Sequence, residues 1–177
     1  ANRLFRLLSR KSPARYSKAA LLSNAALCAV AAGQLVNGLY AYKQALGYQG
    51  RYLPAQYGQA IALLKDGQFR KGLQKLRALK SSDPELKTLR AKHAYFLPDY
   101  DRYFYYAAVF QANGCVRRAD TLWRIYFKKS PRTGPYRWVA HKLRARNQTR
   151  SVKNVKWCHK QYRKTFSAQP EKKGATP

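Results

Sequence analysis

"DGQFRKGLQKL", residues 66–76, carries two glycines five positions apart, and the same spacing occurs at two other places in the chain. Each copy has a glycine, a hydrophobic residue two positions later, a small residue five later and a large apolar residue nine later. The copies are Gly33/Leu35/Gly38/Tyr42, Gly67/Phe69/Gly72/Leu76 and Gly114/Val116/Ala119/Trp123. The pattern predicts that Gly67 forms a turn between two helices and that Gly72 lies where those helices cross.

Small residues and prolines extend this pattern on both sides. An alanine precedes each first glycine by seven residues, and a proline follows two of them, at Pro84 and Pro131. Small side chains let two helices approach closely, and proline ends a helix because it cannot continue the helix interior. The alanines are Ala26, Ala60 and Ala107. We expect hairpins whose first helices cover 20–32, 53–65 and 100–112 and whose second helices cover 35–47, 69–81 and 116–129.

The intervals between the repeated glycines are 34 residues and then 47, which is one period plus an insertion of 13. This helix–turn–helix period resembles the tetratricopeptide and pentatricopeptide (TPR and PPR) superfamily of α-solenoids over residues 20–131. The expected fold class is all-α, a short α-solenoid of about three TPR/PPR-like helical hairpins with basic N- and C-terminal extensions. The chain departs from the family in lacking an early tryptophan and in placing Gly38 and Gly72 where alanine is usual.

The resemblance to pentatricopeptide proteins also implies single-strand RNA reading at one base per repeat. Three irregular repeats form too short a code for a stand-alone specificity factor. Whether the groove of the repeats binds RNA or protein therefore stays open at this point.

Four segments are expected from composition. They are a basic, targeting-like and retained arm over 1–18, a repeat body over 19–131 with an insertion at 85–99, a basic helical extension over 132–166 and a flexible tail over 167–177. In the insertion, Leu86 and Leu89 predict an added helix that ends before Pro98. The aromatic run over 103–110 is expected to pack in the core rather than to stack on bases.

The chain holds 36 basic and 7 acidic residues, a net charge of +29, and the excess lies at its ends. Residues 1–65 contain no acid, and residues 132–177 contain only Glu171. Such a charge indicates a polyanionic partner. Nucleic acid is the first choice, because neutralised phosphates release counterions, and an anionic membrane is the second.

The C-terminal segment is expected to form two helices, the first with Trp138, Val139 and Leu143 on an apolar face. The second helix, starting near Ser151, places cations over much of its circumference, which is typical of phosphate-backbone binding. The predicted RNA-binding residues of both ends of the chain are Arg3, Arg6, Arg10, Lys11, Arg15, Arg137, Lys142, Arg144, Arg146, Arg150, Lys153, Lys156, Lys160, Arg163 and Lys164.

The first 18 residues also read as an organelle-targeting segment. Arginines alternate with leucines and Phe5, and no acid is present. We therefore expect a mitochondrial location, in the matrix, with a plastid as the second choice. The same arm suits contact with a phosphate backbone.

A membrane-spanning segment is the alternative interpretation of residues 19–42, because 24 uncharged residues separate Lys18 from Lys43. Polar side chains inside this stretch and the turn expected at Gly33 favour a helical hairpin instead.

Three cysteines, Cys28, Cys115 and Cys158, lie far apart and in odd number, which favours free thiols in a reducing compartment. Cys158 and its neighbour His159 are expected to be a buried thiol and an exposed imidazole. Asp101 is expected to help cap a helix near residue 102. No catalytic motif is present, so the sequence predicts a protein that is not an enzyme, with no metal site and no cofactor.

The leading hypothesis is a structural constituent of a mitochondrial ribosome. It would contact rRNA through its basic extensions and neighbouring ribosomal proteins through the repeat body. One alternative is an accessory subunit of an inner-membrane respiratory or ATP synthase complex, with residues 19–42 spanning the membrane. Another is a small TPR-like adaptor that binds proteins.

Overall fold

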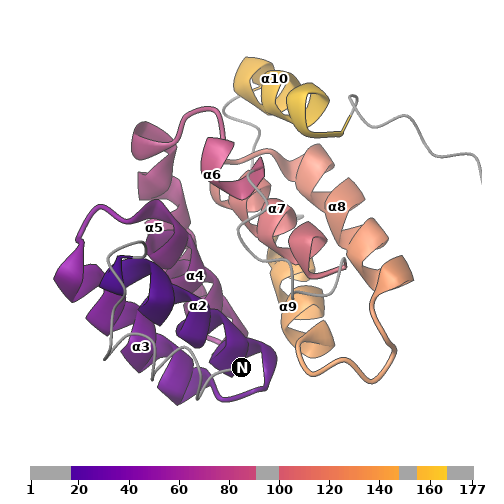
Figure 1. Cartoon of the computed structure of the whole chain (residues 1–177). Helices are drawn as coiled ribbons and strands as arrows, with labels where there is room; N and C mark the ends of the chain where they lie inside the picture. The colour runs from indigo at the N-terminus through magenta and orange to yellow at the C-terminus, as the bar shows by residue number, and fades with distance from the viewer. Residues whose placement is uncertain (1–16, 91–99, 148–154, 167–177) are drawn as a thin grey trace, which may run out of the picture.

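The computed structural model describes residues 17–90, 100–147 and 155–166, and over these residues its regular structure is helical, with no strand (Figure 1). The helices are α2 (Lys18–Ala31), α3 (Leu35–Tyr48), α4 (Leu53–Lys65), α5 (Phe69–Ser82), α6 (Lys87–Arg90), α7 (Asp101–Ala112), α8 (Val116–Lys129), α9 (Arg137–Asn147) and α10 (Val155–Phe166). The three predicted hairpins are confirmed as α2/α3, α4/α5 and α7/α8, with bounds within two residues of those expected.

The first glycine of each repeat forms the turn that the spacing predicts. Gly33, Gly67 and Gly114 have φ angles of 80°, 82° and 78°, in the left-handed region that favours glycine. At the second turn, the amides of Gly67 and Gln68 donate to carbonyls of the preceding helix at 3.0 and 2.9 Å. The same pair of hydrogen bonds closes the other two turns, so one local motif builds all three hairpins.

The second glycine of the repeat lies at a helix crossing, as predicted. A Cβ atom added to Gly72 would stand 2.9 Å from the carbonyl oxygen of Ala60 and 2.6 Å from the side chain of Leu64. A Cβ atom added to Gly38 would stand 3.2 Å from the carbonyl oxygen of Ala26. The missing side chain therefore lets the two helices of the first and second hairpins pack backbone against backbone.

The insertion contains the short helix α6 and changes how the repeats stack. Asp83 accepts hydrogen bonds from the amides of Lys87 and Thr88 at 2.8 and 3.0 Å, which starts α6 directly after α5. Residues 91–99, including Pro98 and Asp99, lie outside the described part of the chain. Helix α4 packs on both helices of the preceding hairpin, α2 and α3, whereas α7 packs on the preceding hairpin mainly through α5. Figure 1 accordingly shows α2–α5 on one side and α7–α9 on the other.

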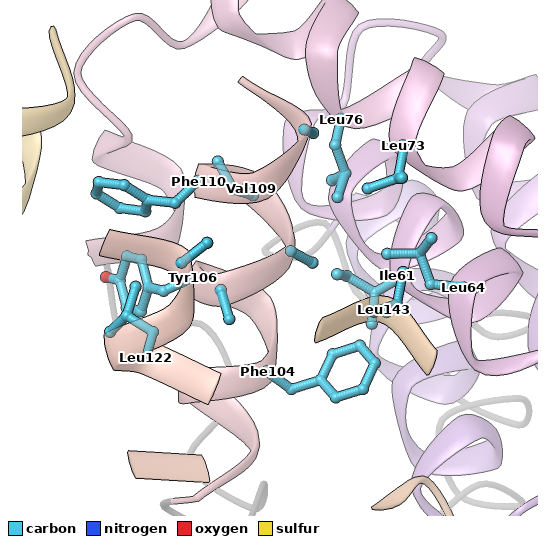
Figure 2. Packing of buried hydrophobic residues seen from close by; sticks show 14 of the residues in the cluster. Ile61, Leu64, Leu73, Leu76, Phe104, Tyr106, Val109, Phe110, Leu122 and Leu143 are labelled. Carbon is cyan, nitrogen blue, oxygen red and sulfur yellow. The ribbon is translucent and has the colours of Figure 1, made fainter. Parts of the chain in front are cut away.

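The main core lies between α4, α5, α7, α8 and α9 (Figure 2). The aromatic run 103–110 is buried there, and the rings of Phe104 and Trp123 meet edge to face with their centroids 5.1 Å apart. Leu143 and Val139 of α9 are fully buried in the same core, so part of the basic C-terminal segment belongs to the packed body. Large aromatic and aliphatic side chains account for this burial.

Trp138 does not join that core, and this expectation was wrong. Its side chain is 50% exposed, and the ammonium of Lys142, one helical turn later, lies 4.8 Å from its ring centroid. The buried face of α9 is formed instead by Tyr136, Val139, Ala140 and Leu143.

A buried ion pair joins the hairpins to one another. The ammonium of Lys65, at the end of α4, donates to both carboxylate oxygens of Asp101 at 2.9 and 3.2 Å. The same ammonium lies 4.3 Å from the ring centroid of Tyr136, whose hydroxyl donates to the carbonyl of Val30. Asp101 therefore pairs with a distant lysine instead of capping its own helix, for which the N-cap residue is Tyr100. Burial, followed by the nearby charge of Asp101, raises the pKa of Tyr136 to about 12.

The uncharged stretch 19–42 is divided between α2 and α3 by the turn at Gly33. Within the described ranges, no helix is long and apolar enough to cross a membrane.

Replacing Gly72 with alanine tests the close crossing. We expect Gly72→Ala to lower the free energy of unfolding by about 1–3 kcal/mol, because the added methyl group overlaps the backbone of α4. Gly47→Ala is the matched control, since nothing lies within 4 Å of its added Cβ. Urea denaturation measures both, and equal effects of the two substitutions would contradict the crossing.

Replacing Lys65 with methionine tests the buried pair. Lys65→Met should cost about 3–5 kcal/mol, because it leaves the Asp101 carboxylate buried and unpaired. The double variant Lys65→Met/Asp101→Asn should recover much of that loss. A double-mutant cycle measured by chemical denaturation gives the coupling energy between Lys65 and Asp101. Additive effects of the two substitutions would contradict a stabilising contact between these side chains.

Candidate nucleic-acid interface

Helix α10 has one face packed on the repeat body and one face turned to solvent. Cys158 and Gln161 of the inner face are 4% and 2% exposed, and Phe166 is partly buried beside them. The outer face carries Lys156, His159, Lys160, Arg163 and Lys164, all exposed. These five residues line one shallow hollow. In Figure 1, α10 lies across the end of the molecule formed by α6, α7 and α8.

A disulfide between Cys115 and Cys158 attaches α10 to the start of α8. The sulfur atoms are 2.05 Å apart and the Cα atoms 5.6 Å apart. The expectation of free thiols was therefore wrong for these two cysteines, and it holds for Cys28. The bond joins residues 43 positions apart, so neither local spacing nor an even cysteine count pointed to it. His159 is exposed, as expected.

Aromatic contacts hold the rest of the inner face. The ring of Phe166 lies 5.2 Å from that of Tyr106 and 6.3 Å from that of Tyr103. The indole of Trp157 lies 5.9 Å from the ring of Phe110, and its Nε1 donates to the carbonyl of Pro84 at 2.9 Å. Burial raises the pKa of Tyr106 to about 12. Helix α10 therefore touches both the second hairpin and the third.

An ion pair adds a third connection between α10 and the body. The ammonium of Lys164 donates to a carboxylate oxygen of Glu85 at 3.0 Å. This hydrogen bond, with the charges of Lys164 and nearby lysines, lowers the pKa of Glu85. Lys164 thus lies on the outer face and also links α10 to the body through Glu85. Among the described residues, Lys156, Lys160 and Arg163 form no hydrogen bond or ion pair.

Carboxylates near this face are already engaged. The described residues contain five carboxylates, and each has at least one polar partner. The partners are Gln68 for Asp66, the amides of Lys87 and Thr88 for Asp83, Lys164 for Glu85, Lys65 for Asp101, and Arg124 with Arg144 for Asp120. Among the described residues, Glu85 is therefore the carboxylate that reaches the outer cations of α10, and it is paired with Lys164.

Several of the other predicted RNA-binding residues have structural contacts. Arg137 donates to the carbonyls of Phe127 and Ser130 at 2.9 and 3.0 Å. Arg144 pairs with Asp120 at 2.7 Å. Arg146 lies over the ring of Phe69, 4.5 Å from its centroid, and Lys142 lies over Trp138. The structure therefore does not gather these arginines with the cations of α10.

The remaining predicted residues lie outside the described part of the chain. They are Arg3, Arg6, Arg10, Lys11, Arg15, Arg150 and Lys153.

Two residues next to the outer face were missed by the sequence analysis. His159 lies among the predicted cations of α10, and Arg118 of α8 contacts it. Helical spacing alone places His159 one turn from Lys156 and Arg163, so the sequence was sufficient to predict that it shares their face. The contact with Arg118 depends on how α10 docks on α8, which spacing does not reveal.

No group of three or more histidine, cysteine or acidic side chains suited to a metal ion occurs in the described ranges. The chemistry available on the outer face of α10 is therefore that of cationic and imidazole donors, which suit phosphate oxygens.

Comparison with protein-family models and with curated proteins finds no match for this chain. Among solved structures, the chain is similar to a tetratricopeptide repeat protein from Parabacteroides merdae. The two are 19% identical, the match covers 96% of this chain and 73% of that one, and the TM-score is 0.43. The assignment of a short, TPR-like α-solenoid therefore rests on the turns, helix bounds and packing described above.

Removing the disulfide tests how α10 is held. Cys115→Ala/Cys158→Ala should lower the free energy of unfolding by about 4 kcal/mol, because the bond closes a long loop in the unfolded chain. Cys28→Ala, at the free cysteine, is the control. Thermal and urea denaturation with and without a reductant measure the effect. The prediction is contradicted if the Cys28 variant loses as much free energy of unfolding as the double variant, or if the double variant loses none.

Proposed function

We propose that this protein is a structural subunit of a mitochondrial ribosome that binds the phosphate backbone of rRNA through the outer face of α10. The observation that carries the proposal is the row of exposed cations Lys156, Lys160 and Arg163 on one face of α10. They extend over about 10 Å of helix, given a rise of about 1.5 Å per residue. A row of this kind is the electrostatic footprint of a protein that neutralises successive phosphates.

The orientation of the aromatic side chains of α10 favours backbone contact over base reading. Trp157, Tyr162 and Phe166 pack against the repeat body, so they are not free to stack on splayed bases. Phosphate contacts carry no sequence information, whereas base edges and stacking platforms do. The proposal is therefore a subunit that recognises the position and shape of folded RNA rather than a sequence.

The packing of the third hairpin gives little support to recognition of one RNA base by each repeat. Helix α9 packs on α7 and α8, and its first turn meets the ends of α2 and α4 through Tyr136. The side chains of α7 are mostly buried by these neighbours. The repeat body is thus a packed scaffold in this region, which suits a structural role.

The proposed protein contacts lie on α3. Val36 and Tyr40, one turn apart on this helix, are 79% and 61% exposed. Large apolar side chains presented together at a surface are typical of protein interfaces. We infer that neighbouring ribosomal proteins pack on this face of the repeat body.

The proposed mitochondrial location rests on the amino-acid pattern of residues 1–18. Disulfides persist mainly in oxidising compartments, so the Cys115–Cys158 bond needs protection in a reducing matrix. Both cysteines are almost fully buried, at 2% and 4% exposure. A reducing thiol must reach a sulfur atom to attack it, and burial limits that access.

The decisive experiment removes the cations of α10 and leaves its inner face unchanged. Lys156→Gln/Lys160→Gln/Arg163→Gln should weaken RNA binding and flatten its salt dependence by about 2 in slope, at about 0.7 per lost phosphate contact. In mitochondrial lysate, the wild-type protein should co-sediment with a ribosomal subunit, leave it after RNase treatment and stay with it in mild detergent. The triple variant should dissociate from the subunit at lower salt.

The matched control removes the same number of exposed charges elsewhere, as Lys43→Gln/Arg51→Gln/Arg132→Gln. This variant should keep the wild-type salt slope on short RNA. Equal losses in both variants would point to net charge alone and would refute an α10 site. Sedimentation with a membrane complex, disrupted by detergent and insensitive to RNase, would favour the respiratory-complex alternative.

A further inference from the structure

Helix α9 presents an exposed tryptophan together with an imidazole and an ammonium group. Trp138, His141 and Lys142 stand at positions i, i+3 and i+4, which lie on one surface of a helix. We propose that this surface, the α9 face, binds an unpaired nucleotide of RNA, with the base stacked on Trp138 and the phosphate held by Lys142. The inference rests on the proposed function, because it takes RNA as the partner, and it assigns a second site away from α10.

The indole of Trp138 is accessible to a base, unlike the other two indoles of the chain. Trp138 is 50% exposed, whereas Trp123 is fully buried and Trp157 packs against Phe110. Unpaired bases stack on the faces of aromatic side chains, and indole is the largest of these ring systems. Trp138 is therefore the tryptophan that can serve as a stacking platform.

Lys142 lies where it can exchange the ring for a phosphate. Its ammonium is 4.8 Å from the centroid of the Trp138 ring. A contact between a cation and a ring is weak at an exposed site, and a charge-assisted hydrogen bond to a phosphate oxygen is stronger. A base that stacks on the indole takes the place of the ammonium, and the flexible lysine side chain then reaches the phosphate of the same nucleotide.

The surroundings of the α9 face are rigid and positively charged. The exposed ring of His141 stacks on Phe127 of α8, with centroids 4.1 Å apart and planes inclined by 22°. The guanidinium groups of Arg137 and Arg144 also lie over Phe127, at 5.3 and 6.0 Å. Helix α9 contains no acid, and Asp120, the acid of α8, is paired with Arg144. An approaching phosphate therefore meets no unpaired carboxylate from α8 or α9.

The α9 face and the outer face of α10 can contact different parts of one RNA. Cys115, at the start of α8, is bonded to α10, whereas Phe127, near the end of α8, contacts His141. These two contacts are separated by about 18 Å of helix, at a rise of about 1.5 Å per residue (Figure 1). Stacking depends little on which base is present, so the α9 face would distinguish an unpaired nucleotide from a paired one.

Two short single-stranded oligomers of equal length separate stacking from charge. One is oligouridine, and the other consists of abasic ribonucleotides, which carry the same phosphates without rings. The wild-type protein should bind oligouridine about tenfold more tightly than the abasic oligomer, for one stacked base. Fluorescence anisotropy of labelled oligomers measures both affinities.

Substitutions on the α9 face assign the two roles. Trp138→Ala removes an exposed ring, so the fold should be kept, and this variant should bind both oligomers as the wild type binds the abasic one. Trp138→Phe keeps a ring and should recover part of the preference for oligouridine. Lys142→Gln should keep that preference and lower the salt slope on both oligomers by about 0.7, for one lost phosphate contact.

Tyr48→Ala is the matched control, because Tyr48 resembles Trp138 in its surroundings. Tyr48 is 63% exposed at the end of α3, and the ammonium of Lys18 lies 5.5 Å from its ring centroid. This variant should keep the full preference for oligouridine. An equal loss of preference in Tyr48→Ala and Trp138→Ala would overturn the assignment to α9.

The outcomes separate this inference from the proposed function. If the wild type binds both oligomers equally while the α10 triple variant loses RNA binding, the α9 site is overturned and the α10 site stands. If the triple variant binds RNA as the wild type does but Trp138→Ala loses the preference, the α10 site is overturned and the α9 site stands. If Trp138→Ala keeps the preference but leaves the ribosomal subunit at lower salt than the wild type, Trp138 contacts a neighbouring protein and the inference is overturned.

Discussion

A single buried ammonium group lies where the three hairpins meet. Lys65 ends the first helix of the second hairpin, and Asp101 begins the first helix of the third. The ring of Tyr136 covers the ammonium, and its hydroxyl donates to the carbonyl of Val30, at the end of α2 in the first hairpin. Helix α7 packs on α5 more than on α4, and this ion pair directly links α4 to α7. A charge buried at such a place is costly without its partner, so removal of either residue should destabilise this arrangement of the hairpins.

The scarcity of acids explains how the other cations of α8 and α9 are held. Arg137 donates to backbone carbonyls, Arg146 and Lys142 lie over aromatic rings, and Arg144 shares Asp120 with Arg124. A chain with many cations and few carboxylates must use carbonyl oxygens and ring faces as partners. The abundance of tyrosine and phenylalanine therefore has a second role besides filling the core. On the outer face of α10, by contrast, several cations contact neither a carbonyl oxygen nor a ring face among the described residues.

The sequence predicted the hairpins well because their determinants are local. A left-handed glycine, a small residue at the crossing and a following proline act within one repeat, and their spacing is visible in the chain. The errors concern contacts between distant segments. The disulfide and the exposure of Trp138 depend on how α10 and α9 pack on the repeats, and the pairing of Asp101 with Lys65 depends on how the second and third hairpins meet. Charge spacing predicts the candidate RNA-binding face on α10, and its binding to RNA stays a prediction. The contact of Arg118 with His159 was not predicted, since it comes from a helix about 40 residues away.

Helix α10 joins stability to binding because its two faces belong to one rigid element. Its inner face contacts the end of α5 through Trp157 and the third hairpin through Cys158 and Phe166, so displacing the helix would open both junctions. The cations of α10 are repelled by the cations of the repeat body, and this repulsion favours an undocked helix when no anion is near. RNA that binds only the docked helix would remove that repulsion and stabilise the docked state by mass action. The covalent bond to Cys115 opposes such undocking with or without an anion, because it attaches α10 to the start of α8.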